Sequence, residues 1–236
     1  MDVRGRMNRP TVSPWTTRLH QYRWLVAPVL AWSAAGLIGV LFLHLGSEVN
    51  EGETRVFDTY FLRVAYAMRA AHPWLEGLMR DLSGLGSTVV LLLLTLGVCG
   101  YLALTRSRVA SAIVLCSIGT GVVAVESLKA AFGRVRPDAA FAAFPATGMS
   151  FPSGHSSMSA VVFLTLGALW AHSHDRIWER VYILCVAALL TVLVGVSRAA
   201  LGVHWATDVI GGWAFGIAWA TAWLLIAKRL DGRPGT

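Results

Sequence analysis

Long apolar runs separated by short polar stretches dominate the pattern of this sequence. A helix needs about 20 apolar residues to cross the hydrocarbon layer of a membrane, and each run approaches that length. Strands of a barrel are excluded because the runs are uniformly apolar instead of alternating. The pattern predicts an all-α integral membrane bundle of six helices, at residues 24–46, 83–104, 109–130, 153–171, 181–201 and 205–228.

The stretch between the first two predicted spans follows another pattern. From residue 53 to residue 80, apolar side chains recur at helical spacing with charged ones between them: Phe57, Tyr60, Phe61, Val64 and Met68, and Arg55, Asp58 and Arg63. This spacing favours an amphipathic helix that lies on the outer membrane interface. A partly ordered loop packed on the bundle is the alternative.

Composition agrees with a membrane protein. The chain is 56% hydrophobic and 14% charged, whereas soluble domains are about 25% charged. Its net charge of +7 does not indicate nucleic acid, because the basic residues form short clusters between the apolar runs. We expect one membrane domain covering residues 1–236. We expect no disulfide, since the three cysteines fall within predicted spans, at Cys99, Cys116 and Cys185.

The basic residues also predict an orientation. Short basic connections face the cytoplasm in membrane proteins. Four basic segments alternate with the other connections: residues 1–23 with Arg4, Arg6, Arg9, Arg18 and Arg23, then Thr105 to Arg108, His172 to Arg180, and the tail from Lys228. Both termini are therefore expected in the cytoplasm, and residues 47–82, 131–152 and the turn near Gly202 outside. Short loops and a basic N-terminus favour a bacterial inner membrane.

Three polar patches interrupt the apolar pattern, all at the outward ends of predicted spans. They place Lys129, Arg136 and Arg198 where helices begin and end. Three cations at membrane depth are costly unless an anion lies among them. Phosphate suits them, because arginine binds its oxygens in pairs and lysine adds a point charge. Ser153 and Gly154 precede a span, so their amides can form an anion cradle at a helix N-terminus.

Two histidines accompany these cations. His204 and Asp208 are four residues apart, so on a helix the carboxylate can accept a hydrogen bond from one ring nitrogen. The other nitrogen is then free to attack phosphorus. His155 lies beside the cradle, where a bound phosphate favours its protonation and a role as general acid. A second pair, His172 and His174, lies on the predicted cytoplasmic side without a further ligand, so we expect no metal site.

The order and spacing of these residues resemble those of the type 2 phosphatidic acid phosphatases, also called the lipid phosphate phosphatase superfamily, in its bacterial membrane branch. The resemblance covers roughly residues 83–228. Its three motifs read Lys129, six residues, Arg136-Pro137; Pro152-Ser153-Gly154-His155; and Ser197-Arg198, five residues, His204, three residues, Asp208.

This resemblance implies a specific chemistry. His204 is expected to form a phosphohistidine, Asp208 to orient it, and His155 to protonate the leaving group. The phosphate-binding residues are expected to be Lys129, Arg136, Ser153, Gly154 and Arg198. Water then hydrolyses the phosphoenzyme, and the family needs neither a metal nor another cofactor.

The remaining predictions concern the surroundings of this site. Phe141, Phe144 and Phe151 suit an acyl or prenyl chain, so the substrate is expected to be a lipid phosphate in the membrane. Undecaprenyl diphosphate is favoured, with phosphatidylglycerol phosphate and phosphatidic acid as the other candidates. The sequence gives no oligomeric state. The alternatives are a lipid phosphotransferase that uses the same phosphohistidine, and a transporter or structural membrane protein without enzymatic activity.

Six further positions are open to two interpretations or carry a structural expectation. Arg134 and Asp138 either border the pocket or lie in a solvated loop. Glu126 is expected to pair with Lys129 one turn further on. A group of glycines in the last span indicates close helix packing, at Gly211, Gly212 and Gly216.

Overall fold

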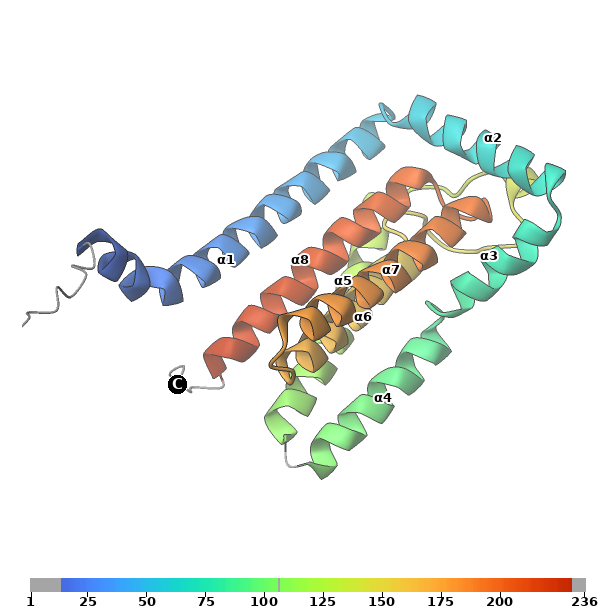
Figure 1. Ribbon diagram of the computed structural model, residues 1–236. Helices are drawn as coiled ribbons and strands as arrows, with labels where there is room; N and C mark the ends of the chain where they lie inside the picture. The colour runs from blue at the N-terminus through green and yellow to red at the C-terminus, as the bar shows by residue number, and fades with distance from the viewer. Residues whose placement is uncertain (1–13, 106, 231–236) are drawn as a thin grey trace, which may run out of the picture.

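The computed structural model describes residues 14–105 and 107–230, and every regular element in that part of the chain is helical (Figure 1). The all-α prediction is therefore confirmed. Arg4, Arg6 and Arg9 of the predicted N-terminal segment lie outside the described residues. The elements are α1 (Pro14–Glu51), α2 (Arg55–Ala71), α3 (Trp74–Gly84), α4 (Thr88–Leu104), α5 (Arg108–Phe132), the 3₁₀ turn η1 (Ala139–Phe141), α6 (Gly154–His172), α7 (Ile177–Ala200) and α8 (Ala206–Leu230).

Six helical stretches of the described chain are long and apolar enough to cross a membrane, as the hydropathy pattern predicts. Their ends lie within a few residues of the predicted ones, except that the second begins earlier. They are Val29–Glu51, Trp74–Leu104, Arg108–Phe132, Gly154–His172, Ile177–Ala200 and Ala206–Leu230. The chain is an integral membrane protein with six spans.

The prediction of one amphipathic helix from 53 to 80 is wrong at its C-terminal end. The helix α2 stops at Ala71, because the backbone of His72 leaves the helical region (φ −134°, ψ 83°) before Pro73. The residue before a proline is sterically disfavoured in a helix. The next helix, α3, belongs to the second span, which bends where Ser87 caps the start of α4.

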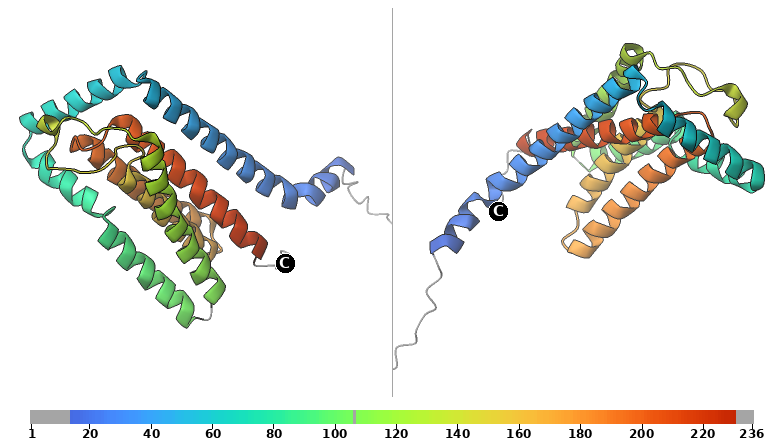
Figure 2. Two further views of the ribbon diagram at one scale, coloured as in Figure 1. Left: turned by 180° about the vertical axis from the view of Figure 1, so that it is seen from behind. Right: turned by 90° about the horizontal axis from the view of Figure 1, so that it is seen from above.

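The centre of the bundle is formed by α6, α7 and α8, which pack along one another, while α1 runs beside α8 and the α4–α5 hairpin covers α6 (Figures 1 and 2). Glycines allow the closest approach. A Cβ at Gly212 would lie 2.8 Å from the Cβ of Ser156, and one at Gly216 would lie 2.7 Å from the carbonyl oxygen of Ser157. The predicted close packing by the glycines of the last span is confirmed for the α6–α8 contact.

Phe151 belongs to this core and not to a lipid pocket, which corrects its predicted role. Its side chain is fully buried. The ring stacks on Phe42 of α1, with centroids 5.6 Å apart, and meets Phe132 of α5 edge to face at 4.8 Å. A Cβ at Gly211 would clash with the same ring. Phe151 therefore joins three helices, and its burial leaves no surface for an acyl chain.

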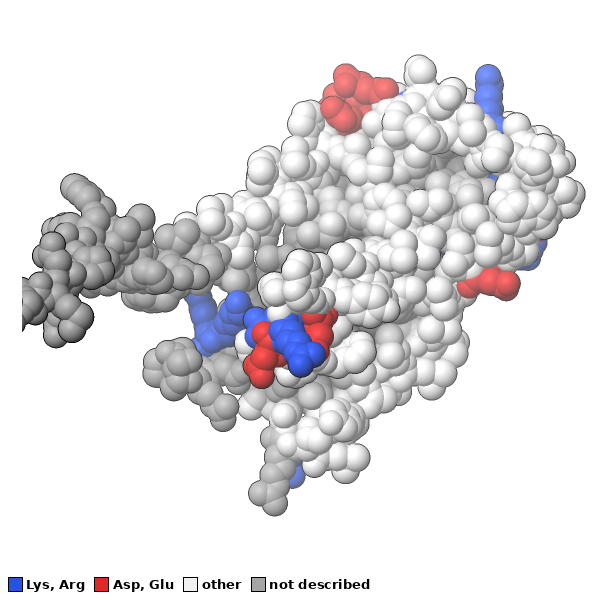
Figure 3. Space-filling view, in the orientation of Figure 1, with Lys and Arg blue, Asp and Glu red and all other residues white. Residues whose placement is uncertain are grey.

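The two ends of the bundle differ in chemistry. At one end lie the α4–α5 turn, the α6–α7 turn and the C-terminal end of α8, as the charge pattern predicts (Figure 2). At the other, which we call the site end, α2 lies across the ends of α7 and α8 with residues 133–153 and the turn from 201 to 205. On the face shown in Figure 3, a mixed cluster of acidic and basic side chains lies below the centre, and a broad uncharged surface separates it from the few charged side chains at the upper and right edges.

Candidate active site

His204 lies in the short turn between α7 and α8. The turn requires Gly202. Its backbone is left-handed (φ +70°), and a Cβ at this position would clash with the carbonyl of Phe141. A side chain would be strained there in both respects. The turn directs the imidazole of His204 inward, where it is only 2% exposed.

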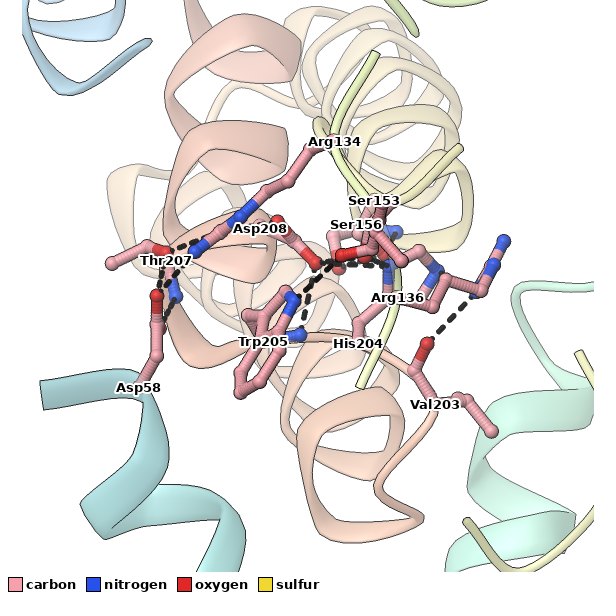
Figure 4. A network of polar contacts seen from close by, with 12 residues as sticks. Asp58, Arg134, Arg136, Ser153, Ser156, Val203, His204, Trp205, Thr207 and Asp208 are labelled. Atoms are coloured by element: carbon pink, nitrogen blue, oxygen red, sulfur yellow. Dashed lines mark hydrogen bonds and ion pairs between the residues drawn. The ribbon is translucent and has the colours of Figure 1, made fainter. Parts of the chain in front are cut away.

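Asp208 lies on the first turn of α8 and is fully buried. Its Oδ2 lies 3.3 Å from Nδ1 of His204 and accepts hydrogen bonds from the hydroxyl of Ser150 and from the backbone N–H of Trp205 at 2.9 Å. Its Oδ1 accepts a hydrogen bond from Nη1 of Arg134 at 2.6 Å. The predicted pairing of His204 with Asp208 is therefore present, and both carboxylate oxygens are held in place (Figure 4).

Arg136 reaches the other side of the imidazole. Its Nη1 lies 3.0 Å from Nε2 of His204 and donates to the carbonyl of Val203 at 2.8 Å. Arginine has no acceptor, so Nε2 must be the unprotonated nitrogen and Nδ1 must carry the proton toward Asp208. This tautomer leaves the lone pair of Nε2 available for nucleophilic attack.

The electrostatic setting keeps His204 neutral. Burial lowers the pKa of His204 from 6.5 to about 4, although the hydrogen bond and charge of Asp208 act in the opposite direction. Burial also lowers the pKa of Arg136, against the stabilising charge of Asp208. An imidazole at this position is therefore neutral across the physiological pH range and can act as a nucleophile.

Lys129 and the Ser153–Gly154 segment approach each other as predicted. Ser153 caps α6, accepting from the backbone N–H of Ser156 at 3.4 Å. A Cβ at Gly154 would lie 3.2 Å from Nζ of Lys129. The predicted ion pair of Lys129 with Glu126 is also present, at 3.0 Å. The lysine ammonium therefore lies at the N-terminus of α6, where backbone amides and a cation can both face an anion.

Arg198 and His155 complete the set of predicted residues. Arg198 is buried near the end of α7, and its Nη1 donates to the hydroxyl of Ser83 at 2.8 Å. Its Nε is buried without a partner among the described residues, which leaves a donor for an anion. His155 is partly buried on the first turn of α6 and lies within electrostatic reach of Arg198, His204 and Lys129. The three motifs thus converge at the site end.

A cavity of about 250 Å³ opens beside Arg136. Phe144 lines it, and the guanidinium of Arg198 lies 5.6 Å from the centroid of the same ring. Phe141 instead packs edge to face on Tyr66, with centroids 5.4 Å apart. Of the three phenylalanines expected near a lipid chain, Phe144 alone borders this cavity.

Two charged residues of the site were missed or left open by the sequence pattern. Arg134 is not in a solvated loop, because its side chain is only 14% exposed and bridges Asp208 and Asp58. Asp58 is on α2 and only 1% exposed, although its place in an amphipathic helix suggested a solvated residue. The sequence did contain one indication that Asp58 is buried. It lies four residues after Thr54 and four residues before Leu62, and all three side chains are buried on the same side of α2. Asp138 is exposed and caps η1.

Within the described residues, no group of three or more histidine, cysteine, aspartate or glutamate side chains could hold a metal ion. The histidine and aspartate of the site instead face each other and arginine. The donors around the site suit an anion and not a cation.

Comparison with known proteins assigns this architecture to a class, the membrane lipid phosphatases. The chain belongs to the PAP2 superfamily, whose family model matches residues 110–231. That segment contains all three motifs, so the resemblance found in the sequence is confirmed.

Individual relatives agree with this assignment. Phosphatidylglycerophosphatase B of Bacillus subtilis (strain 168) is 32% identical over 184 residues, which cover 75% of this chain and 87% of the relative. A lipid A 1-phosphatase of Rhizobium etli is 32% identical over 124 residues, covering 45% of this chain and 49% of that protein.

Two solved structures share the fold. The crystal structure of a transmembrane PAP2-type phosphatidylglycerolphosphate phosphatase from Bacillus subtilis superposes with a TM-score of 0.77 at 27% identity, covering 86% of this chain and 98% of the other. LpxE from Aquifex aeolicus gives a TM-score of 0.57 at 27% identity, covering 71% and 94%. The helical fold is thus one already seen in a transmembrane phosphatase.

Proposed function

We propose that this lipid phosphatase removes a terminal phosphate from a membrane lipid through a phosphohistidine on His204. The observation that carries the proposal is that the two ring nitrogens of His204 contact different residues. Nδ1 faces the carboxylate of Asp208, and Nε2 faces Arg136 among further cations. A buried neutral imidazole oriented by a carboxylate is the arrangement that nucleophilic catalysis requires.

In the first step, Nε2 of His204 attacks phosphorus, and the bond between phosphorus and the lipid oxygen breaks. Arg136 exchanges its contact with Nε2 for the phosphate oxygens, which are stronger acceptors because they are charged. Lys129 and Arg198 hold the remaining charge of the transition state. Protonated His155 gives its proton to the departing lipid oxygen.

In the second step, water attacks the phosphohistidine and the phosphorus–nitrogen bond breaks. His155, now neutral, accepts a proton from that water, which returns it to the acid form. The products are inorganic phosphate and the dephosphorylated lipid. Every step uses residues of the three motifs, and none needs a metal.

Among the three candidate lipids, we place phosphatidylglycerol phosphate first, ahead of undecaprenyl diphosphate and phosphatidic acid. This changes the preference drawn from the sequence. The support is the relative named phosphatidylglycerophosphatase B, whose match covers three quarters of this chain.

We further propose that the site end faces the exterior of a bacterial inner membrane, with both termini in the cytoplasm. The support is the basic character of the opposite end, where Arg176 precedes α7, Arg180 lies on its first turn, and α8 ends with Lys228 and Arg229. Short basic connections remain on the cytoplasmic side.

The function is tested with purified protein, the three candidate lipids and EDTA, by measuring free phosphate. We expect turnover that survives chelation and is fastest with phosphatidylglycerol phosphate. His204→Ala should lower kcat by about a thousandfold or more, as removal of a catalytic nucleophile does. Glu53→Gln, an exposed position outside the site, is the matched control and should leave kcat unchanged.

The same assay separates the alternatives. Phosphate release without a second lipid identifies a hydrolase, whereas phosphate transfer only in the presence of an acceptor lipid identifies a phosphotransferase. Unchanged turnover by His204→Ala protein would contradict the histidine mechanism, and loss of wild-type activity in EDTA would contradict the metal-free one.

A further inference from the structure

Outside the three motifs, the strongest polar cluster of the described chain joins α2 to the start of α8. It consists of Asp58, Arg134 and Thr207, with Asp208 at its inner end (Figure 4). Arg134 places Nη2 2.6 Å from Oδ2 of Asp58 and Nη1 2.6 Å from Oδ1 of Asp208. One guanidinium therefore binds two buried carboxylates from different helices.

Asp58 is fully engaged by this cluster. Its Oδ1 accepts the backbone N–H of Thr207 at 2.9 Å, and its Oδ2 accepts the hydroxyls of Thr207 at 2.7 Å and Thr54 at 3.1 Å. Thr207 directly precedes Asp208 in the first turn of α8. Asp58 thereby fixes both the guanidinium that holds Asp208 and the backbone that carries it.

The loop after α5 brings two arginines to the two ends of the histidine–aspartate pair. Arg136 lies at Nε2 of His204, and Arg134 lies at the far oxygen of Asp208. The imidazole and the carboxylate are thus aligned between two guanidiniums that are two residues apart in the chain. Charge matters as well as geometry, because Asp58 balances Arg134 and leaves the negative charge of Asp208 available to His204.

We propose that Asp58 and Arg134 are positioning residues that hold Asp208 in the orientation and ionisation state that His204 needs. The inference rests on the proposed role of His204. Neither residue touches the phosphate; both act through Asp208. The same contacts make α2, which presents its apolar face outward and its polar face to the bundle, part of the support of the site.

The test compares Asp58→Asn, Arg134→Gln and the double variant with two exposed controls, Glu53→Gln and Arg63→Gln. We expect kcat to fall about 10-fold for Asp58→Asn and about 100-fold for Arg134→Gln, the range seen when groups that orient active-site ligands are removed. KM should change little, because the phosphate contacts remain. The control variants should match the wild type.

A pH profile of kcat/KM separates positioning from general damage. The charged and titratable groups around Asp208 are His204, Arg134, Arg136 and Asp58. Without Arg134, the negative charge beside His204 is no longer balanced, which favours the protonated imidazole and raises the pH at which His204 loses its proton. The acid limb of Arg134→Gln should therefore move toward neutral pH, and removing Asp58 as well should move it back. General structural damage would lower kcat/KM at every pH without shifting the pH at which the acid limb falls.

Arg134→Lys keeps the charge but cannot bind both carboxylates in parallel, so it extends the test if Arg134→Gln does not fold. We expect a smaller loss of kcat with a limb near that of the wild type. If Asp58→Asn and Arg134→Lys both had the kcat and the pH profile of the wild type, the inference would be overturned. The proposed phosphohistidine mechanism would not be affected by that result. Full activity of His204→Ala would instead remove the mechanism on which the inference rests.

Discussion

A single imidazole has two nitrogens, and in His204 each has a separate partner. The contact of Nε2 with arginine fixes the tautomer, so the proton lies on Nδ1 toward Asp208. Burial makes the protonated ring unfavourable and thereby removes the competing acid form. Both contacts and the lowered pKa of His204 suit the proposed nucleophilic role.

This preparation has a consequence for pH. Because the pKa of His204 is lowered to about 4 by burial, its imidazole remains neutral between pH 4 and 6.5, where an ordinary histidine becomes protonated. We expect the limb of kcat/KM that belongs to His204 to lie near pH 4. The profile is measured with a lipid phosphate and with the corresponding thiophosphate, which ionises at lower pH. A limb near 6.5 with both substrates would contradict the prediction.

At the residue scale, the sequence predicts those site residues whose relation depends on short spacings along the chain. All eight proposed site residues lie in three short motifs, so their order and spacing along the chain are informative. Asp58 and Ser150 contact the site only through packing of segments distant in sequence. The charge of Arg134 was visible, but its two partners were not, because no pattern in one chain pairs α2 with α8.

At the scale of elements, lipid makes the helices predictable. Each backbone amide in the membrane must be paired within its own helix, so apolar length alone gives the spans. The predicted helix bounds are wrong where the chain leaves the helical conformation at the ends of the spans. The helix α2 ends before Pro73, and the break between α3 and α4 lies at Ser87, whose extended backbone caps the start of α4. Both breaks depend on local sterics that hydropathy does not measure.

Close packing of α6 against α8 gives an element-scale prediction. In Gly216→Ala the added methyl would meet the carbonyl of Ser157 at 2.7 Å and push the two helices apart. Overpacking of this kind costs about 1–3 kcal/mol, and we expect a lower melting temperature in detergent. Gly119→Ala in α5 is the control, because no atom lies within 4 Å of the added methyl. Equal melting temperatures for the two variants would refute the packing argument.

At the scale of the whole molecule, the charge pattern sorts the connections into two groups, and the described connections of each group lie at one end of the bundle. The site end contains α2 and the motif loops, and the opposite end contains the basic turns. Helices of alternating direction explain why the sorting works, since each crossing reverses the side on which the next connection lies.

The proposed orientation is tested by labelling single cysteines. After Cys99, Cys116 and Cys185 are replaced by alanine, Glu53→Cys places a thiol at the site end and Ser173→Cys places one at the opposite end; both positions are exposed. A membrane-impermeant maleimide should label the first in intact cells and the second only after permeabilisation. The reverse pattern would put the site in the cytoplasm.

The packing of α1 against α8 also bears on how the protein is made. Chains emerge from the ribosome with the N-terminus first, so α1 and α2 reach the membrane long before their neighbour exists. Asp58 meets Thr207, and Arg134 meets Asp208, only when the last helix has been inserted. The proposed nucleophile and its carboxylate are made just before and within that same helix. Under the proposed mechanism, catalytic competence is therefore acquired at the end of synthesis, and an unfinished chain in the membrane carries the proposed phosphate-binding residues without the group that would react there.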